Sequence, residues 1–259
     1  MFTGLGNWDS ENNMNIVFSF DDGRSDAYHA FEILKKHGLT GSFHITTGFI
    51  DGSFSTEAFG EGRKPLKIDQ LLEMAKSGMD ISSHGDKHLM DEDDFSISLR
   101  KISNFCGPKE KIGFSVPNSK YSESELLTFK NKTLSRLSYI RVGRSKKCYS
   151  FWMKVCYVLY HRFHLQSSFN LFNKHNLLNE INKFEIHSLV VLSDTSSKNL
   201  ISFIDKYKGT KATLVLMFHS IVDTPSNKWE YSGKDFDDIC SFVSKNCTIK
   251  TLEDIANEC

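Results

Sequence analysis

The chain of 259 residues lacks the features that define several large classes of protein. Its six cysteines include no Cys-x-x-Cys pair, which argues against a zinc ribbon and against a redox dithiol. Its 32 basic residues are balanced by 32 acidic residues, so no net positive charge points to nucleic acid as the main partner. No uninterrupted apolar run is long enough to span a bilayer, and we expect no transmembrane segment.

The first residues and the cysteines lead to an expectation about location. Residues 1–9 contain neither the basic region nor the apolar core of a secretory signal. Scattered thiols with no evident pairing are typical of proteins in a reducing compartment. We therefore expect a cytoplasmic protein, while the sequence leaves its oligomeric state open.

Short apolar runs alternate with segments of helical period along the chain. This alternation is typical of an α/β fold with a parallel sheet. The length suits either one barrel-like domain or two smaller domains. The apolar runs predict strands at 15–20, 41–46, 79–83, 111–114, 138–144, 184–192 and 213–218.

Two segments do not fit a simple alternation. Residues 49–64 form a Gly/Ser-rich stretch, which we interpret as a loop at the rim of a site. Residues 151–172 are rich in aromatic side chains mixed with Lys, His and Arg. We expect this second segment to pack on the barrel as core, and the alternative is an amphipathic patch that touches a membrane or a lipid-linked substrate.

Polar groups directly follow three of the predicted strands. Asp21 and Asp22 follow the first, His84 and His88 the third, and His219 the last. Adjacent carboxylates repel and favour a cation or a shared proton between them, and imidazole is a common partner of carboxylate on zinc. Each group alone also suits a solvated turn, a surface pair or a core histidine. Because the carboxyl ends of parallel strands share one face of a barrel, the set predicts one site.

The identity, order and separation of these groups resemble the polysaccharide deacetylase family, which is carbohydrate esterase family four. The resemblance rests on Phe-Ser-Phe-Asp-Asp-Gly at 18–23, Ser-His-Gly-Asp-Lys-His at 83–88 and Leu-Val-Leu-Met-Phe-His at 214–219, and it runs from about residue 15 to 255. It implies a distorted (β/α) barrel with about seven parallel strands, as a single catalytic domain over 1–259. It also implies removal of an N-acetyl group from an amino sugar in a saccharide or sugar polymer. With the expected cytoplasmic location, we expect the substrate to be a soluble or lipid-linked saccharide precursor.

The resemblance also implies roles for individual residues. It assigns a divalent metal, expected to be zinc, to three side chains: Asp22, His84 and His88. It makes Asp21 the general base, His219 the general acid, and the backbone N–H at Asn118, after Pro117, an oxyanion donor. The chemistry is consistent, because three protein ligands leave zinc a position for a water whose pKa falls to about 7.

The third motif departs from the family pattern. The family has Arg-x-Pro-Tyr-Gly where residues 115–119 read Ser-Val-Pro-Asn-Ser, so the arginine beside the base is missing. We expect Arg141 or Arg144 to replace it, and we expect Arg24 to point to solvent. Trp229 is a further candidate for substrate binding.

Two other functions remain open on the sequence. One is a metal-containing carbohydrate-binding protein without turnover, and the other is a hydrolase of another non-peptide C–N bond on the same metal site. The presence of both Asp21 and His219, which a binding protein does not need, favours an enzyme.

Overall fold

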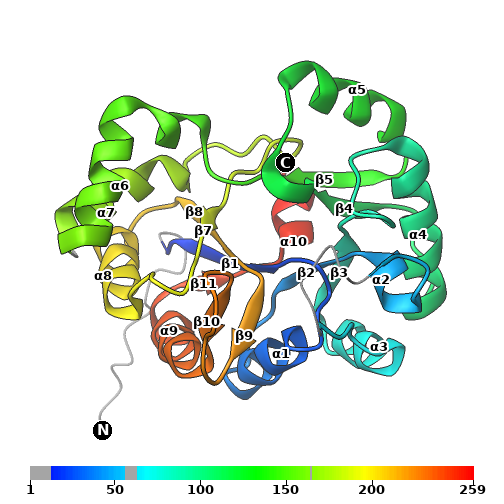
Figure 1. The fold of residues 1–259 in the computed structure, drawn as a ribbon, viewed down its shortest axis with the longest axis horizontal. Helices are drawn as coiled ribbons and strands as arrows, with labels where there is room; N and C mark the ends of the chain where they lie inside the picture. Colours follow the sequence, from blue (N-terminus) through cyan, green and yellow to red (C-terminus); the bar gives the residue numbers. More distant parts are fainter. Residues whose placement is uncertain (1–12, 56–62, 164) are drawn as a thin grey trace, which may run out of the picture.

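A parallel β-sheet forms the centre of the fold in a computed structural model that describes residues 13–55, 63–163 and 165–259 (Figure 1). Its strands run in the order β5-β4-β3-β2-β1-β8, and β7 also pairs with β8. These seven parallel strands are β1 (Asn15–Phe20), β2 (Ser42–Ile45), β3 (Asp80–Ser83), β4 (Ile112–Ser115), β5 (Leu137–Arg141), β7 (Leu189–Val190) and β8 (Thr213–Phe218). The predicted α/β barrel is confirmed.

Shorter strands extend this arrangement. β6 (Leu177–Leu178) pairs antiparallel with β8, and β11 (Thr248–Ile249) pairs parallel with β1. β9 (Ser220–Val222) and β10 (Glu230–Ser232) form a separate parallel pair directly after β8.

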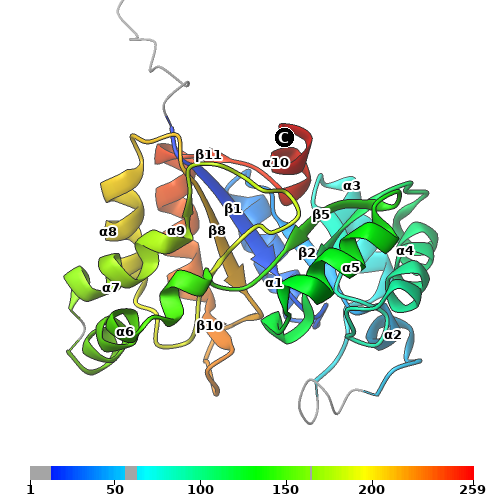
Figure 2. The ribbon, with the colours of Figure 1, turned by 90° about the horizontal axis from the view of Figure 1, so that it is seen from above.

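Helices surround the sheet (Figures 1 and 2). They are α1 (Ala27–Lys36), α2 (Thr47–Asp51), α3 (Ile68–Lys76), α4 (Glu92–Cys106), α5 (Glu123–Thr133), α6 (Phe151–Phe163), α7 (Gln166–Asn173), α8 (Ser197–Tyr207), α9 (Gly233–Asn246) and α10 (Leu252–Asn257). Polar side chains cap the N-termini of several helices: Asp91, Ser122 and Ser232 each accept a hydrogen bond from a backbone N–H in the first turn of the helix that follows. No helix of the described residues is both long and apolar enough to cross a membrane.

Alternation along β1 separates an apolar layer from a polar interior. Phe18 and Phe20 point toward the helices, where the Phe20 ring stacks on Phe43 at 4.6 Å between centroids. Ser19 and Asp21 alternate with these residues and therefore point to the other face of the sheet, where they lie in the interior of the barrel with other buried polar groups. The same strand therefore supplies part of the core and part of the site.

The segment 183–191 closes the sheet between β5 and β8. Its backbone bonds to β5 at Ile140 and Val142, and Val191 N–H then donates to the Met217 carbonyl of β8. We expected a continuous strand over 184–192, whereas a regular ladder forms only at β7. The reason is that this segment changes partner halfway, from β5 to β8, and cannot keep one register.

Two other expectations need correction. Part of the predicted loop 49–64 is helical, because α2 extends to Asp51, and residues 56–62 of that loop lie outside the described part of the chain. The aromatic segment 151–172 is only partly core. It forms α6 and α7, and α6 packs mainly against α7 rather than on the sheet, so Phe151 and Trp152 are each 71% exposed.

Candidate functional site

The predicted metal ligands lie together at the carboxyl ends of β1 and β3. His84 Nε2 is 3.5 Å and His88 Nε2 is 3.8 Å from Asp22 Oδ1, and the two Nε2 atoms are 3.1 Å apart. These three side chains form a group whose ligand atoms all lie within 4.8 Å of one another. Ligand atoms bound at about 2.0 to 2.1 Å to a tetrahedral zinc lie about 3.3 Å apart, so the donor set fits such an ion.

The tautomer of His84 also fits metal binding. Its Nδ1 is 2.9 Å from the backbone carbonyl oxygen of Ser115. A carbonyl only accepts, so Nδ1 must carry the proton, and Nε2 presents its lone pair toward Asp22. Burial lowers the pKa of His84 to about 3 and also lowers the pKa of His88, in spite of the nearby carboxylates. Both imidazoles are therefore neutral near pH 7, as ligands must be.

The loop that carries the two histidines is held by α4. The carboxylate of Asp94 accepts the backbone N–H groups of Asp86 and Lys87 at 2.8 and 2.9 Å. Gly85 has φ +84°, and a Cβ there would lie 2.4 Å from the Asp94 carboxylate. The glycine therefore allows the helix to approach the loop closely enough to fix it.

Backbone strain concentrates around the same site. Among the residues that the structure describes, four non-glycine residues have positive φ: Asp22 (75°), His88 (61°), Asn118 (55°) and Ser119 (52°). All four line one cavity of about 570 Å³. Residues in this region of φ cost free energy and persist where the surrounding structure imposes them, which is common at functional sites.

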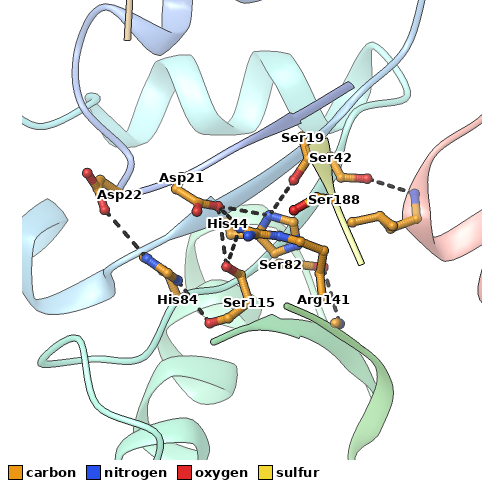
Figure 3. Close-up of polar contacts among 12 residues, drawn as sticks. Ser19, Asp21, Asp22, Ser42, His44, Ser82, His84, Ser115, Arg141 and Ser188 are labelled. Atoms are coloured by element: carbon orange, nitrogen blue, oxygen red, sulfur yellow. Dashed lines mark hydrogen bonds and ion pairs between the residues drawn. The ribbon is translucent and has the colours of Figure 1, made fainter. Parts of the chain in front are cut away.

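Asp21 is buried beside Arg141, as Figure 3 shows. The Arg141 guanidinium, fully buried at the end of β5, donates to Asp21 Oδ1 and to the Ser115 hydroxyl oxygen. Burial by itself raises the pKa of Asp21, but Arg141 and the nearby histidines outweigh it and hold this pKa well below its usual range. Asp21 is thus ionised near neutral pH.

Arg141 therefore occupies the position that we expected for a replacement of the missing arginine. Arg144 does not: its Nη2 donates to the Val190 carbonyl at 3.3 Å, and its guanidinium lies over Tyr157 and Phe172. The expectation for Arg24 is wrong. Its side chain is buried and its Nη2 lies 2.7 Å from Asp22 Oδ2, because the turn at Gly23 folds the chain back over the carboxylates.

A buried polar network lies beneath Asp21 in the barrel interior. His44 Nδ1 is 3.6 Å from Asp21 Oδ1, and His44 Nε2 is 3.0 Å from the Tyr139 hydroxyl, which donates to Asp80 at 2.7 Å. Burial, with Arg141, lowers the pKa of His44 to about 4. The sequence analysis missed His44 and Tyr139, although His44 lies between the apolar residues Phe43 and Ile45 in its strand.

His219 follows β8 and lines the cavity with Trp229. Its ring lies 4.6 Å from the Trp229 ring, centroid to centroid. Burial lowers the pKa of His219, against the two aspartates, and its Nδ1 is buried with no hydrogen-bond partner among the described residues. Its resting form near pH 7 is therefore the neutral imidazole.

The remaining candidates lie around the cavity mouth. Asn118 and Arg144 line the cavity together with Tyr149, whereas Pro117 is buried at the start of the 3-10 turn Pro117–Ser119. The site thus combines a donor set for one divalent cation, an ionised buried carboxylate and an imidazole. Such a site can bind a cation and exchange protons on two sides of a ligand.

The chain is similar to known proteins in part of its sequence and in its fold. Residues 9–134 match the sequence model of the family described as polysaccharide deacetylase. No curated protein sequence is detectably similar to the chain.

Three solved structures illustrate the fold. A family 4 acetyl xylan esterase from Clostridium thermocellum, in complex with a cobalt ion, superposes with a TM-score of 0.54 at 13% identity, over 94% of this chain and 91% of that one. A peptidoglycan deacetylase from Bacillus subtilis gives 0.51 at 13%, over 96% and 94%. A family pseudoenzyme from Bacillus anthracis gives 0.51 at 10%, over 96% and 67%. At these identities the likeness concerns the fold.

Proposed function

Because the chain belongs to the polysaccharide deacetylase family, we propose that it is a metal-dependent hydrolase that removes an N-acetyl group from an amino sugar in a saccharide. The observation that carries this proposal is one juxtaposition at the cavity. Three metal-ligating atoms converge within 4.8 Å, and an ionised Asp21 lies in the next position of the same turn.

We propose that Asp22, His84 and His88 hold the ion and that it is zinc. When bound, such an ion lowers the pKa of a coordinated water and polarises the acetyl carbonyl. The two neutral imidazoles and one carboxylate form a donor set that zinc accepts, and the Ser115 carbonyl keeps His84 in the required tautomer. The cobalt ion reported for the esterase from Clostridium thermocellum belongs to that protein and supports a divalent cation here by analogy.

Asp21 is proposed as the general base. Its contact with Arg141 keeps the carboxylate ionised and aims it, although a lowered pKa also makes it a weaker base. His219 is proposed to protonate the departing amine. Since burial favours its neutral form, His219 has to gain a proton when substrate is bound before it can serve as an acid.

The substrate is proposed to be an N-acetylated amino sugar, free or as part of a lipid-linked precursor. The partly exposed Trp229 beside His219 offers an aromatic surface for a sugar ring, and Arg144 and Asn118 offer polar contacts at the cavity. The backbone N–H of Asn118 is the proposed oxyanion donor. The Bacillus subtilis protein that shares the fold is named as a peptidoglycan deacetylase, and its name refers to the same type of reaction.

A second candidate is a carbohydrate-binding protein without turnover. It is favoured by two observations: the third-motif arginine is replaced by Ser115, and a relative of the same fold is a pseudoenzyme. The intact pairing of Asp21 with Arg141 argues against this candidate, because binding a sugar does not require an aimed base.

The deciding experiment measures acetate release from N-acetylated amino sugars and oligosaccharides, and from O-acetylated xylo-oligosaccharides, with and without zinc. We expect release from an N-acetylated substrate that depends on the metal. Asp21→Asn should lower kcat by about 100-fold or more while metal content stays at the parental level. A parent protein that binds a saccharide, holds metal and releases no acetate from any substrate would support the binding protein instead.

A further inference from the structure

The outer half of α6 exposes large apolar side chains. Phe151 and Trp152 are each 71% exposed, and Val158 and Phe163 are each 57% exposed. We call these four residues the α6 apolar face. Met153 and Tyr160, which are seven residues apart, lie on the opposite side of the helix and are buried. The helix therefore has an inner side that packs on the protein and an outer side that lacks apolar cover.

This concentration differs from the rest of the surface. Exposed large hydrophobic residues elsewhere are fewer on any one element, with Ile68 on α3 and the pair Leu127 and Leu134 at α5 as examples. Tyr149 and Leu165 extend the exposed apolar side chains at both ends of α6. Single exposed apolar residues are ordinary, but a contiguous apolar surface indicates an interaction site.

The charged side chains of the segment that carries the α6 apolar face have one sign. No Asp or Glu occurs between Glu125 and Glu180 in a chain whose net charge is zero. Lys147, Lys154 and Arg162 are exposed there, and the structure gives none of the three an ion pair with a described acidic residue. By contrast, Lys146 pairs with Glu123 and His161 with Asp194. We call Lys147, Lys154 and Arg162 the basic flank.

We propose that the α6 apolar face and the basic flank bind the surface of an anionic lipid bilayer. The partner must offer both an apolar interior and negative charge, and an anionic bilayer offers both. α6 has 13 residues, fewer than the about 20 needed to span, so it lies in the plane of the interface. Trp and Phe side chains are suited to that depth, because Trp in particular favours the membrane-water boundary.

A second copy of the chain is a poorer fit to the same surface. A symmetric dimer through the α6 apolar face would bring the two basic flanks together, and like charges oppose such contact. The described residues that flank the face offer no exposed carboxylate on α6 to relieve this repulsion.

The proposed surface adjoins the cavity of the candidate site. Tyr149, two residues before α6, lines that cavity together with Arg144. α6 also lies on the side of the molecule toward which β1 and β8 point (Figure 2). Binding a bilayer here places the cavity beside lipid headgroups, where a lipid-linked saccharide is presented. This last consequence rests on the proposed function, whereas bilayer binding does not.

The test is co-sedimentation of the full chain with vesicles of phosphatidylcholine alone or with 30 to 50% phosphatidylglycerol. We expect binding to the anionic vesicles that weakens as salt is raised. A Phe151→Ser, Trp152→Ser variant and a Lys147→Glu, Lys154→Glu, Arg162→Glu variant should each lose binding. One basic residue near an anionic surface changes the partition coefficient about fivefold, so the triple change should weaken it about 100-fold or more.

Matched control variants have the same kinds of substitution on other helices. Leu127→Ser on α5 removes an exposed apolar residue, and Lys76→Glu, Lys206→Glu, Lys245→Glu makes the same change of charge; both should bind as the parent does. In a variant with Trp8→Phe and Trp229→Phe, brominated lipid should quench the fluorescence of Trp152. Far-UV circular dichroism checks that every variant is folded.

Three outcomes would overturn the proposal: equal binding to neutral and anionic vesicles, parental binding by both α6 variants, or a concentration-dependent dimer that the Phe151 and Trp152 changes dissociate. The last would assign the α6 apolar face to a second copy. Acetate release from a soluble substrate, which should be unchanged in the α6 variants, separates failure of this proposal from failure of the proposed function.

Discussion

At the scale of single residues, the pairing of Asp21 with Arg141 decides whether the site holds an ionised carboxylate. Asp21 is buried, and an unpaired buried carboxylate would gain a proton. Arg141 comes from β5 rather than from the third motif on β4, where Ser115 takes the place of the family arginine. The hydroxyl of Ser115 joins the same cluster, 3.3 Å from Asp21 Oδ1. The buried carboxylate therefore has a guanidinium partner, which comes from β5 instead of from the third motif.

We predict that Arg141→Ala lowers kcat and moves the acidic limb of kcat/KM to higher pH. The sign follows from the causes that act on Asp21: burial raises its pKa, whereas Arg141 first and the nearby histidines after it lower this pKa. Without Arg141 the largest of the lowering causes is lost, so the carboxylate takes up a proton at a higher pH than in the parent. The measurement is the pH profile of acetate release.

Arg144→Ala is the control for the position of the acidic limb, which it should leave unshifted, since Arg144 contacts the Val190 carbonyl rather than Asp21. Ser115→Ala should also change little. If Arg141→Ala kept the parental rate with an unshifted acidic limb, Arg141 would have no role in aiming the base.

At the scale of elements, β4 and β5 approach each other around a glycine. A Cβ at Gly113 would lie 1.9 Å from the ring of Tyr139, which is fully buried in the barrel interior. The Tyr139 hydroxyl links His44 to Asp80, and His44 lies beneath Asp21. The absence of a side chain on β4 thus lets the network that supports the base form.

We predict that Gly113→Ala destabilises the fold by about 2 kcal/mol or more, because the ring or the backbone has to move in a packed interior. For a chain of this size that loss corresponds to a fall in Tm of about 4 to 8 °C. Thermal unfolding followed by circular dichroism measures it. Gly209→Ala is the matched control, with no atom within 4 Å of the added Cβ, and should unfold near the parental temperature. Equal Tm values for the two variants would contradict this account of β4.

At the scale of the whole molecule, the candidate metal site joins two distant parts of the chain. Asp22 follows β1, whereas His84 and His88 follow β3, and the ligand atoms of the three side chains lie within 4.8 Å of one another. An ion that binds only the folded protein stabilises it by mass action. The fold and the site are therefore linked thermodynamically.

We predict that zinc at about 100 times its Kd stabilises the protein by about 2.7 kcal/mol, which raises Tm by about 5 to 10 °C. A chelator should reverse the shift. The His84→Ala, His88→Ala variant should show no shift and should bind less metal by elemental analysis. His29→Ala, a change at a partly exposed histidine outside the candidate site, should respond as the parent does. Equal metal content in the parent and the double variant would remove the basis for the site.

The location of the protein is also a whole-molecule property. All six cysteines are free in the structure. We propose that the protein works in the cytoplasm, and on the inner face of a membrane if α6 binds lipid. Cell fractionation with thiol labelling tests this proposal. Recovery of the native protein outside the cytoplasm with disulfides formed would contradict it.

The sequence by itself determined the parallel α/β architecture and the residues that converge on the site. Apolar strands followed by Asp21 and Asp22, by His84 and by His219 are local patterns, and parallel strands must bring their carboxyl ends to one face. The family resemblance of the three motifs then singled out Asp22, His84 and His88 among these residues as candidate metal ligands. Properties that depend only on strand order and strand ends can be predicted before the fold is known.

Only the tertiary structure decided which groups contact those residues and which surfaces stay uncovered. Arg141, and not Arg144, reaches Asp21 because side chains from strands far apart in the sequence meet in the barrel. Arg24 contacts Asp22 because the chain folds back at the turn between them. The aromatic segment 151–172 has the same composition whether its outer half is covered or not, and the packing of α6 on α7 leaves it exposed. Contacts between distant segments depend on the three-dimensional arrangement of the elements, which local periodicity does not encode.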